Sequence, residues 1–476
     1  MDSFWGKLKE KRLMAIYLVL FFSFFLRFLL ILKSNHLWWD QAIYIGMGKY
    51  LFSGGRIGYW ENFRGPLWPI LQGIIWKAGL DNIFWGKFLE VIFSSASVWL
   101  VYLIGEKIKK NVGLIAAILF GFTPFYFYLS AVGLTDIPSL FLALLAVYLV
   151  AAERPYLAGL SAALAFLTRF PEGLIVVPLG LAYFLEIYRG NMPSRAPVFH
   201  KFLYFLNGFL LLVIPYFLLN YLLYKEAFLP LLRANAAFHE YLFIYPLNPL
   251  FYLLKIPLEN PLLLFALVTL FLVFSKRREI SDNRIFLLNI LILVIIGGYY
   301  FFIAPIKDLR YAIAFLPYLA IFAAYSIEWI FEKLQSAKPI MIIIGLILIM
   351  FILRLDISTS PYMKSGLAKD SATYNLYDHF KDRKTINSSS PFPLAYSDIK
   401  INKIFETWPQ AAKVYLNQKG TGNYLLINSC DLICRPEDRV CQDEEKEFLT
   451  EVDRSSLKLY DATENSCHLL IYQMNQ

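Results

Sequence analysis

The sequence predicts a polytopic α-helical membrane protein that carries a small α/β domain after its last span. Of the 476 residues, 58% are hydrophobic and only 17% are charged, a balance that excludes an ordinary soluble protein. Apolar runs of about 20 residues, the length that crosses a bilayer, recur from residue 13 to residue 353. All four cysteines lie beyond these runs, where helical and extended patterns alternate.

About eleven segments are predicted to be transmembrane helices. The first, at 13–32, is rich in Phe and Leu, and no small-residue cleavage site follows it, so we expect an uncleaved anchor. The others lie at 86–104, 112–130, 136–152, 156–170, 173–188, 202–224, 261–274, 285–304, 311–331 and 339–353. Residues 1–353 are therefore predicted to form a transmembrane domain, and residues 354–476 a second domain.

The distribution of Lys and Arg predicts the orientation of the chain in the plasma membrane. The N-terminal tail carries Lys7, Lys9, Lys11 and Arg12, and every second connection after it is also basic. Because basic loops stay in the cytoplasm, the N-terminus is predicted to be cytoplasmic. An odd number of spans then places residues 354–476 outside.

The net charge of +9 does not indicate a nucleic-acid partner. Most of the basic excess lies in the predicted cytoplasmic loops, where it sets the orientation. From Arg354 onward the chain has 15 Lys and Arg against 17 Asp and Glu. The predicted outer domain is therefore slightly acidic.

The cysteines are expected to form disulfides. Their even number and their restriction to a domain placed outside favour this interpretation over a zinc site, since no paired C-x-x-C spacing occurs. One bond is expected to tie the last strand to the 430–441 loop, with the pairing open among Cys430, Cys434, Cys441 and Cys467.

Local patterns predict elements outside the spans. Residues 37–52 have helical periodicity and three aromatic residues, so they are predicted to form a helix along the membrane interface, ended by Gly54-Gly55. A second surface stretch is expected at 225–260. In the last domain, helices are predicted at 369–381, 409–418 and 441–452, and extended segments at 392–397, 423–428 and 466–473.

Ionisable residues gather at the predicted outer ends of the spans. Such residues are costly near lipid, so each is a candidate for function. The set consists of Asp40, Glu61, Arg64, Asp136, Arg169, Glu172, Arg233, His239, Glu240, Lys307, Asp308 and Arg310. The deep interiors of the spans are predicted to hold almost no ionisable groups, which favours chemistry at one membrane face.

Five motifs, in order over residues 1–350, resemble those of glycosyltransferases that use polyprenyl-phosphate sugars. The family includes protein O-mannosyltransferases and aminoarabinose–lipid A transferases, and its fold is called GT-C. The motifs are Asp40-Gln41-x-x-Tyr44 (Asp-Glu-x-x-Tyr in the family), Phe63-Arg64-Gly65-Pro66-Leu67 (Lys-Pro-Pro-Leu), Leu134-Thr135-Asp136-Ile137-Pro138 (Leu-Thr-Asp-x-Pro), Phe166-Leu167-Thr168-Arg169-Phe170-Pro171 (Leu-Thr-Lys-Gly-Pro), and Leu309-Arg310-Tyr311 with Leu316-Pro317 (Arg-Tyr and Leu-Pro). Gln41 departs from the family's acidic residue, and Gly65 replaces a proline.

The resemblance implies a membrane glycosyltransferase with a dolichyl- or other polyprenyl-phosphate sugar donor. Transfer to a hydroxyl needs a base, for which Asp40 is the candidate. It also needs positive charge on the leaving phosphate, which Arg64, Arg169 and Arg310 would supply. The side chains expected to support this site are Tyr44, Glu61, Asp136 and Glu240.

The same residues have structural alternatives. Asp40 could stabilise the first turn of an interfacial helix, and Asp136 could cap the span that begins beside Pro138. Each arginine could be a snorkelling anchor at the membrane surface. The convergence of several such residues at one face, rather than any single one, carries the functional interpretation.

The alternative function is a transporter or flippase of lipid-linked sugars, which would call for internal repeats and charged groups near the bilayer midplane. The expected partners are the polyprenyl-phosphate sugar, membrane lipids and a protein, lipid or glycan acceptor. No cofactor and no metal are expected, because arginines can hold a monophosphate leaving group.

Overall fold

The computed structural model describes residues 2–34, 37–189, 192–240, 248, 250–275, 283–334, 385–418, 423–432, 439–464 and 467–474. Contacts divide this part of the chain into two compact units, each described separately below. The first contains the described residues of Met1–Ser34, Phe63–Leu67 and Lys87–Leu367, and the second those of Asn35–Asn62, Trp68–Gly86 and Ala368–Gln476. Most of the loop between the first two predicted spans, residues 33–85, therefore groups with the C-terminal region. The predicted boundary at 353–354 falls outside the described residues.

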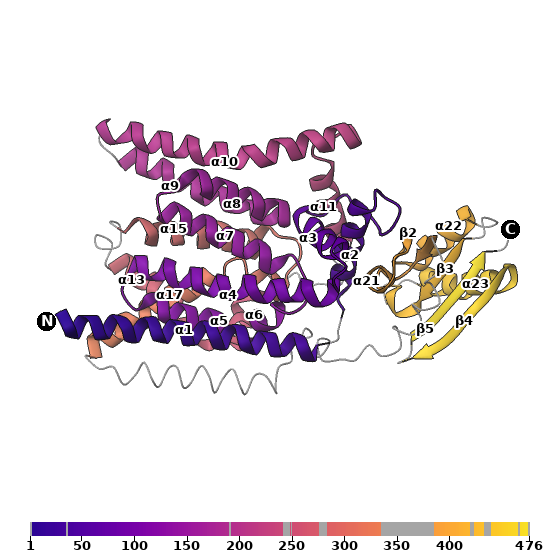
Figure 1. The fold of residues 1–476 in the computed structure, drawn as a ribbon, viewed down its shortest axis with the longest axis horizontal. Coiled ribbons are helices and arrows are strands. Elements are labelled where there is room, and N and C mark those ends of the chain that lie inside the picture. Colours follow the sequence, from indigo (N-terminus) through magenta and orange to yellow (C-terminus); the bar gives the residue numbers. More distant parts are fainter. Residues whose placement is uncertain are drawn as a thin grey trace. The chain divides into compact units, whose positions relative to one another are not determined.

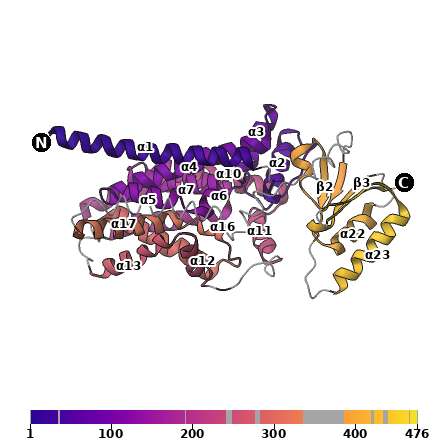
Figure 2. The ribbon, with the colours of Figure 1, turned by 90° about the horizontal axis from the view of Figure 1, so that it is seen from below.

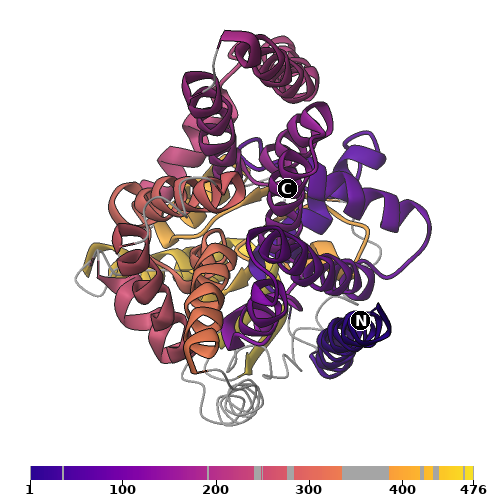
Figure 3. The ribbon, with the colours of Figure 1, turned by 90° about the vertical axis from the view of Figure 1, so that its left-hand side faces the viewer.

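The first unit is built of apolar helices. Its long members run in roughly the same direction in Figure 1, and Figure 3 views them nearly end on. The helices of this unit, long and short, are α1 (Asp2–Lys33), α4 (Asn82–Ile108, from Lys87 onward), α5 (Val112–Gly121), α6 (Pro124–Leu129), α7 (Asp136–Ala151), α8 (Pro155–Thr168), η1 (Phe170–Ile175), α9 (Val176–Arg189), α10 (Met192–Tyr224), α11 (Leu229–Glu240), α12 (Phe251–Glu259), η3 (Pro261–Leu264), α13 (Phe265–Ser275), α15 (Arg284–Ile292), the π-helical η4 (Leu293–Gly297) and η5 (Tyr299–Ile303), α16 (Leu309–Ala312) and α17 (Leu316–Leu334).

Five helices of the described chain are long and apolar enough to cross a membrane: Leu13–Lys33, Asn82–Ile108, Phe170–Tyr188, Ala196–Tyr224 and Arg284–Ile303. Four shorter apolar helices cover other predicted spans, at Val112–Gly121, Asp136–Ala151, Pro155–Thr168 and Pro261–Val273. A membrane protein with several spans is thus confirmed, and the number eleven stays a prediction. The predicted span at 339–353 lies outside the described residues.

Two predicted spans are not continuous α-helices. The segment 112–130 is divided into α5 and α6 because Pro124 cannot continue the helix before it and instead opens the next one. The segment 285–304 passes from α15 into π-helix. The Lys307 ammonium donates hydrogen bonds to the carbonyls of Tyr300, Phe301 and Ala304, and so closes the end of this helix.

Glycines allow two helices of this unit to approach closely. A Cβ on Gly159 of α8 would lie 2.0 Å from the carbonyl oxygen of Phe205 in α10. In return, a Cβ on Gly208 of α10 would lie 2.2 Å from the carbonyl oxygen of Tyr156 in α8. Small residues are the usual means by which membrane helices bring their backbones together, since lipid offers no hydrophobic driving force.

The second unit contains a five-stranded sheet with the order β2-β1-β3-β5-β4. Its strands are β1 (Thr385–Ser388), β2 (Lys400–Ile404), β3 (Tyr424–Asn428), β4 (Ser456–Glu464) and β5 (Cys467–Met474). β1 is parallel to both β2 and β3, whereas β5 is antiparallel to β3 and to β4. Helices α22 (Trp408–Gln418) and α23 (Arg439–Ser455) share a core with β3 and β5, and Figures 1 and 2 show them beside these strands.

The predictions for this region are partly correct. The elements predicted near α22, α23, β3 and β5 are confirmed as helices and strands. The extended segment predicted at 392–397 is wrong, because Pro393–Tyr396 forms the short helix α21. Pro393 begins this helix and Leu394 is fully buried, so tertiary packing overrides the local extended pattern. The helix predicted at 369–381 lies outside the described residues.

The loop between the first two predicted spans, residues 33–85, contributes to the second unit. It contains α2 (Trp39–Phe52), close to the predicted interfacial helix, and most of α3 (Leu67–Lys77). Gly54 and Gly55 have φ angles of 65° and 78°, which explains why a glycine pair ends α2. Beyond them, Gly58 forms a parallel bridge with Lys400 and thereby extends the sheet past β2. The Gly58 N–H donates to Ile399 at 2.7 Å, and the Ile401 N–H donates to Gly58 at 3.0 Å.

A disulfide joins Cys430 to Cys467 in the second unit, with the Cα atoms 5.3 Å apart. It ties the beginning of β5 to the turn that follows β3. Cys441 is also disulfide-bonded, and Cys434 lies outside the described residues.

Candidate functional site

A buried cluster of charges in the first unit is centred on Asp136. This residue begins α7, and its carboxylate is 1% exposed. Its Oδ1 lies 3.3 Å from Nη2 of Arg169 and 3.3 Å from Nε of Arg310. Two predicted phosphate-binding arginines, from motifs more than 140 residues apart, thus share one carboxylate.

Arg169 is held from several sides. It stands in extended conformation between α8 and η1, with φ −153° and ψ 115°, where Pro171 prevents α8 from continuing unchanged. Its Nη1 donates to Oε1 of Glu172 at 2.9 Å, and both side chains are buried. The guanidinium also lies over the ring of Tyr311, 4.9 Å from its centre. Both terminal nitrogens of Arg169 therefore face buried carboxylates.

Arg310 is the more accessible arginine of the pair. Its side chain is 21% exposed, compared with 9% for that of Arg169. Asp308 caps the short helix α16 by accepting a hydrogen bond from the Arg310 backbone N–H at 2.9 Å. The Arg310 guanidinium lies 5.5 Å from the centre of the Tyr311 ring, so the same tyrosine borders both arginines.

Arg64 belongs to the same unit, and its backbone lies close to that of Arg169. A Cβ on Gly65 would lie 2.5 Å from the carbonyl oxygen of Leu167 and 2.6 Å from that of Thr168. Only glycine fits between these backbones without a shift, which gives a physical reason for the departure at this motif position. The Arg64 side chain is half-buried, with its guanidinium 5.6 Å from the centre of the Phe63 ring.

Glu90 of α4 was not among the predicted site residues, yet it holds the loop before Asp136. Its carboxylate is fully buried and accepts hydrogen bonds from the backbone N–H groups of Gly133, at 2.5 Å, and Leu134, at 2.6 Å. Gly133 has a φ of 80°, a conformation that favours glycine. A carboxylate inside a predicted apolar span was the sequence signal that could have revealed it.

Arg27 is a second buried charge that the sequence analysis missed. It is fully buried in α1 and donates to Ser23 and, at 2.7 Å, to the carbonyl oxygen of Gly121. Arg27 and Glu90 lie within about five residues of an end of the predicted spans 13–32 and 86–104, so the expectation of almost no ionisable groups in the deep interiors of the spans stays a prediction. Arg27 has a structural explanation, since it satisfies a carbonyl where α5 ends.

The predicted base, Asp40, lies in the second unit. It is half-buried in the first turn of α2, two residues after the N-cap residue Trp38, where the helix dipole favours a carboxylate. Tyr44 and Glu61 belong to the same unit and are 6% and 8% exposed. Glu240 is the last residue of α11 in the first unit.

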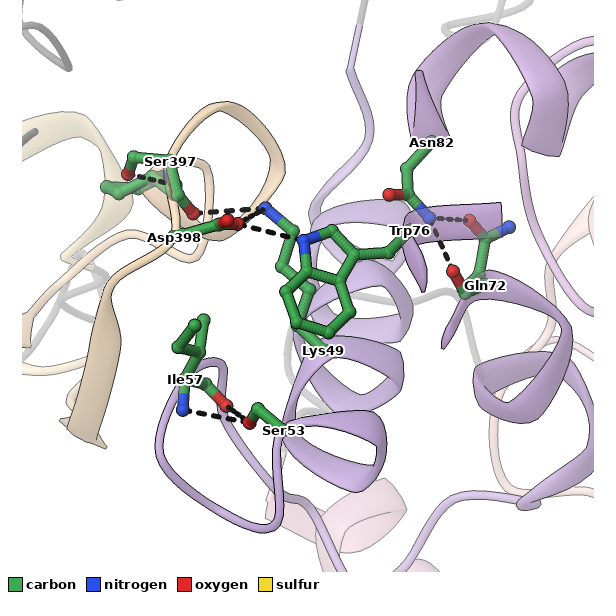
Figure 4. A network of polar contacts seen from close by, with 9 residues as sticks. Lys49, Ser53, Ile57, Gln72, Trp76, Asn82, Ser397 and Asp398 are labelled. Atoms are coloured by element: carbon green, nitrogen blue, oxygen red, sulfur yellow. Dashed lines mark hydrogen bonds and ion pairs between the residues drawn. The ribbon is translucent and has the colours of Figure 1, made fainter. Parts of the chain in front are cut away.

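A polar network fixes the C-terminal half of α2 (Figure 4). Nζ of Lys49 lies 3.0 Å from Oδ1 of Asp398 and donates to the Ser397 carbonyl at 3.0 Å. Nε1 of Trp76 in α3 donates to the same Asp398 oxygen at 3.0 Å. Burial lowers the pKa of the Lys49 ammonium, and the nearby Asp398 carboxylate opposes that shift. Neither Lys49 nor Asp398 was predicted to be functional.

Lys307, a candidate in the sequence analysis, has a structural role. Its ammonium has three protons, and three backbone carbonyls accept hydrogen bonds from it at 2.7 to 3.0 Å. Burial lowers the pKa of this ammonium. Within the described ranges, no group of three or more His, Cys, Asp or Glu side chains is arranged to hold a metal ion.

Comparisons with known proteins confirm the resemblance seen in the sequence. Residues 64–219 match the profile of the dolichyl-phosphate-mannose-protein mannosyltransferase family. This region contains Arg64, Asp136 and Arg169. No curated protein matches the sequence.

The fold is similar to that of solved GT-C enzymes. ArnT from Cupriavidus metallidurans bound to undecaprenyl phosphate has a TM-score of 0.57 and 10% identity, with coverage of 96% of this chain and 97% of that chain. The same protein in the apo state gives 0.57 and 10%, with coverage of 99% and 98%. The oligosaccharyltransferase from Archaeoglobus fulgidus gives 0.54 and 13%, with coverage of 96% and 73%.

Proposed function

We propose that this protein is an integral-membrane glycosyltransferase that moves a sugar from a polyprenyl-phosphate donor to a hydroxyl acceptor on the outer face of the membrane. The observation that carries the proposal is the buried cluster in which Asp136 holds Arg169 and Arg310. The family match over residues 64–219 and the ArnT-like fold support it.

The reaction forms one bond and breaks another at the anomeric carbon of the donor sugar. The acceptor hydroxyl attacks this carbon while Asp40 takes the hydroxyl proton. The bond between the carbon and the phosphate oxygen breaks, and the polyprenyl phosphate leaves with the electron pair. Negative charge therefore grows on the phosphate, where arginine side chains stabilise it.

The arginines divide this task according to their surroundings. Asp136 and Glu172 carry two formal negative charges, and Arg169 and Arg310 balance them with two positive charges. Arg64, on the adjoining backbone, adds a further positive charge. We assign direct phosphate contact to Arg310 and Arg64, the more exposed side chains, and a smaller share to Arg169, whose terminal nitrogens face Glu172 and Asp136.

The remaining parts of the proposal follow from orientation and chemistry. The N-terminus lies on the cytoplasmic side of the plasma membrane, because basic loops stay in the cytoplasm. The C-terminal region lies outside, where disulfides such as Cys430–Cys467 form. The acceptor hydroxyl belongs to a protein, a lipid or a growing glycan. Tyr44, Glu61 and Glu240 support the site.

A donor-competition assay tests the function. Membranes that contain the protein are incubated with radiolabelled polyprenyl-phosphate sugars or with nucleotide sugars, and membranes that contain the Asp40→Asn variant serve as the control. We expect label to reach an acceptor only from the lipid-linked donor and only with the unmodified protein. Direct transfer from a nucleotide sugar in membranes free of polyprenyl phosphate would contradict the proposal.

A further inference from the structure

One short segment of the C-terminal region follows α2 along its length. The ring of Phe392 meets that of Trp39 edge to face, with centres 6.3 Å apart. Further along, a Cβ on Gly46 would lie 2.5 Å from Cδ1 of Leu394, which is fully buried. Ser397 and Asp398 then bind Lys49 near the end of the helix. The contacts therefore occur in the same order along α2 and along residues 392–398.

The last of these contacts is more than a surface ion pair. The Lys49 side chain is 5% exposed, so its ammonium has left water and depends on the oxygens of Ser397 and Asp398. Asp398 also accepts the Trp76 hydrogen bond, so one carboxylate joins α2, α3 and the segment after β1 (Figure 4). Removing it would leave a buried charge poorly compensated.

Asp40 is adjacent to Trp39 in the first turn of the same helix. A helix is stiff over three turns, so a segment that fixes Trp39, Gly46 and Lys49 also fixes the position and tilt of Asp40. Catalytic groups must be held to within a fraction of an ångström of their working position. The side chains packed around them provide this precision.

We propose that residues 392–398 position the catalytic base, with Lys49 and Asp398 as positioning residues, so that the C-terminal region is part of the catalytic apparatus. This inference rests on the proposed function. It assigns Asp398 no contact with substrate and makes it act through α2.

The test compares Asp398→Ala with Asp461→Ala. The two aspartates match well, because their side chains are 54% and 50% exposed and each pairs with a lysine of the same unit, at 3.0 and 3.1 Å. Amide hydrogen exchange is measured over α2, and kcat and donor KM are measured with a polyprenyl-phosphate sugar. Trp76→Phe, which removes only one donor to Asp398, provides a milder variant, and Asp398→Glu tests for rescue.

For Asp398→Ala we expect exchange in residues 41–49 to accelerate by about 10-fold or more, since a hydrogen bond to a charged group is lost. We expect kcat to fall about 10-fold with donor KM within about 2-fold, because Arg64 and Arg310 are untouched. Trp76→Phe should shift both quantities less and in the same direction, Asp398→Glu should restore part of each, and Asp461→Ala should leave both unchanged.

Two results would overturn the inference: faster exchange in α2 with unchanged kcat, or reduced kcat with unchanged exchange in α2. An effect of Asp461→Ala equal to that of Asp398→Ala would also overturn it. If the unmodified protein keeps a protected α2 but uses no lipid-linked donor, the proposed function is what has failed, and the positioning role falls with it.

Discussion

Asp40 is the residue on which the proposed chemistry depends most directly. The Asp40→Asn variant retains the size and helix position of the side chain but cannot accept the proton. We expect the transfer rate to fall about 10²- to 10⁴-fold, the usual effect of losing a general base. Turnover in purified protein measures this, with the amount of inserted protein as control. Near-normal turnover would move the base to Glu61 or Glu240.

Arg310, the more accessible of the two arginines beside Asp136, provides a second residue-scale prediction. Arg310→Ala should weaken the binding of polyprenyl phosphate by about 10- to 100-fold, the range for a lost charged hydrogen bond. Arg310→Lys should recover part of the affinity, because lysine retains the charge but not the planar fork. Direct binding measurements test this, with Arg284→Ala, which removes an exposed arginine that is not part of the Asp136 cluster, as the control. Equal loss in the two alanine variants would count against the site.

Glu90 is predicted to stabilise the Asp136 loop. In Glu90→Gln an amide N–H₂ must face the backbone N–H of Gly133 or Leu134, so one buried donor loses its acceptor. We expect the free energy of unfolding to fall by about 1–3 kcal/mol. Thermal unfolding in detergent measures this, and Glu332→Gln, on an exposed ion pair with Lys109, should change stability little. A stability change confined to the control would contradict this role.

At this scale the sequence revealed the residues that stand in motifs but not those that hold them. Asp136, Arg169 and Arg310 could be singled out because each is an ionisable residue at the end of an apolar run. Glu90 could not be assigned a partner, because its two carboxylate oxygens accept hydrogen bonds from backbone N–H groups 43 and 44 residues away. Lys49 was not singled out, because its partner Asp398 lies 349 residues further along the chain.

Among the elements, the crossing of α8 and α10 depends on its two glycines. Gly159→Ala would place a Cβ 2.0 Å from a backbone carbonyl oxygen, which cannot move as a side chain can. We expect a loss of about 1–3 kcal/mol, the usual effect of overpacking, despite the better helix propensity of alanine. Thermal unfolding in detergent measures the loss.

Gly180 of α9 is the matched control for that substitution. A Cβ there would meet its nearest neighbour, the Phe202 ring, at 3.8 Å, an ordinary contact. Gly180→Ala should therefore be neutral or stabilise by up to about 1 kcal/mol. Equal melting temperatures for the Gly159→Ala and Gly180→Ala variants would show that α8 and α10 can move apart without loss of stability.

Element prediction succeeded where periodicity was long and failed where packing decided. The long apolar helices such as α4 and α10, and the charged helix α23, have patterns of three or more turns, which few alternative folds can satisfy. The helix α21 has only four residues, and its buried Leu394 is fixed by α2, a contact far away in sequence. The π-helical end of the 285–304 segment depends on Lys307, which no pattern of apolar residues can reveal.

For the whole molecule, orientation and oxidation can be tested together. We expect a thiol reagent that cannot cross the membrane to label the cysteines of intact cells only after reduction, because Cys430 and Cys467 are bonded and the proposed location is outside. Four reactive thiols before reduction would contradict the disulfides. Labelling that requires a breached membrane would contradict the orientation.

The division into units was the part of the architecture least accessible to sequence analysis. Composition separates the apolar run from the polar tail at about residue 353, and this is a real change in the chain. Composition cannot reveal that α2 and α3, which lie between apolar runs, share a unit with the tail. That grouping is created by particular contacts, such as the bridge between Gly58 and Lys400.

The bond between Lys49 and Ser397 also has a consequence for biosynthesis, because it joins residues 348 positions apart. At ordinary translation rates the second partner leaves the ribosome roughly 20 to 70 s after the first. During that interval α2 has been released, but the segment that holds it does not yet exist. If residues 392–398 position α2 as proposed, the active enzyme is completed only when the end of the chain has been made and folded, and a prematurely terminated chain would insert in the membrane without becoming active.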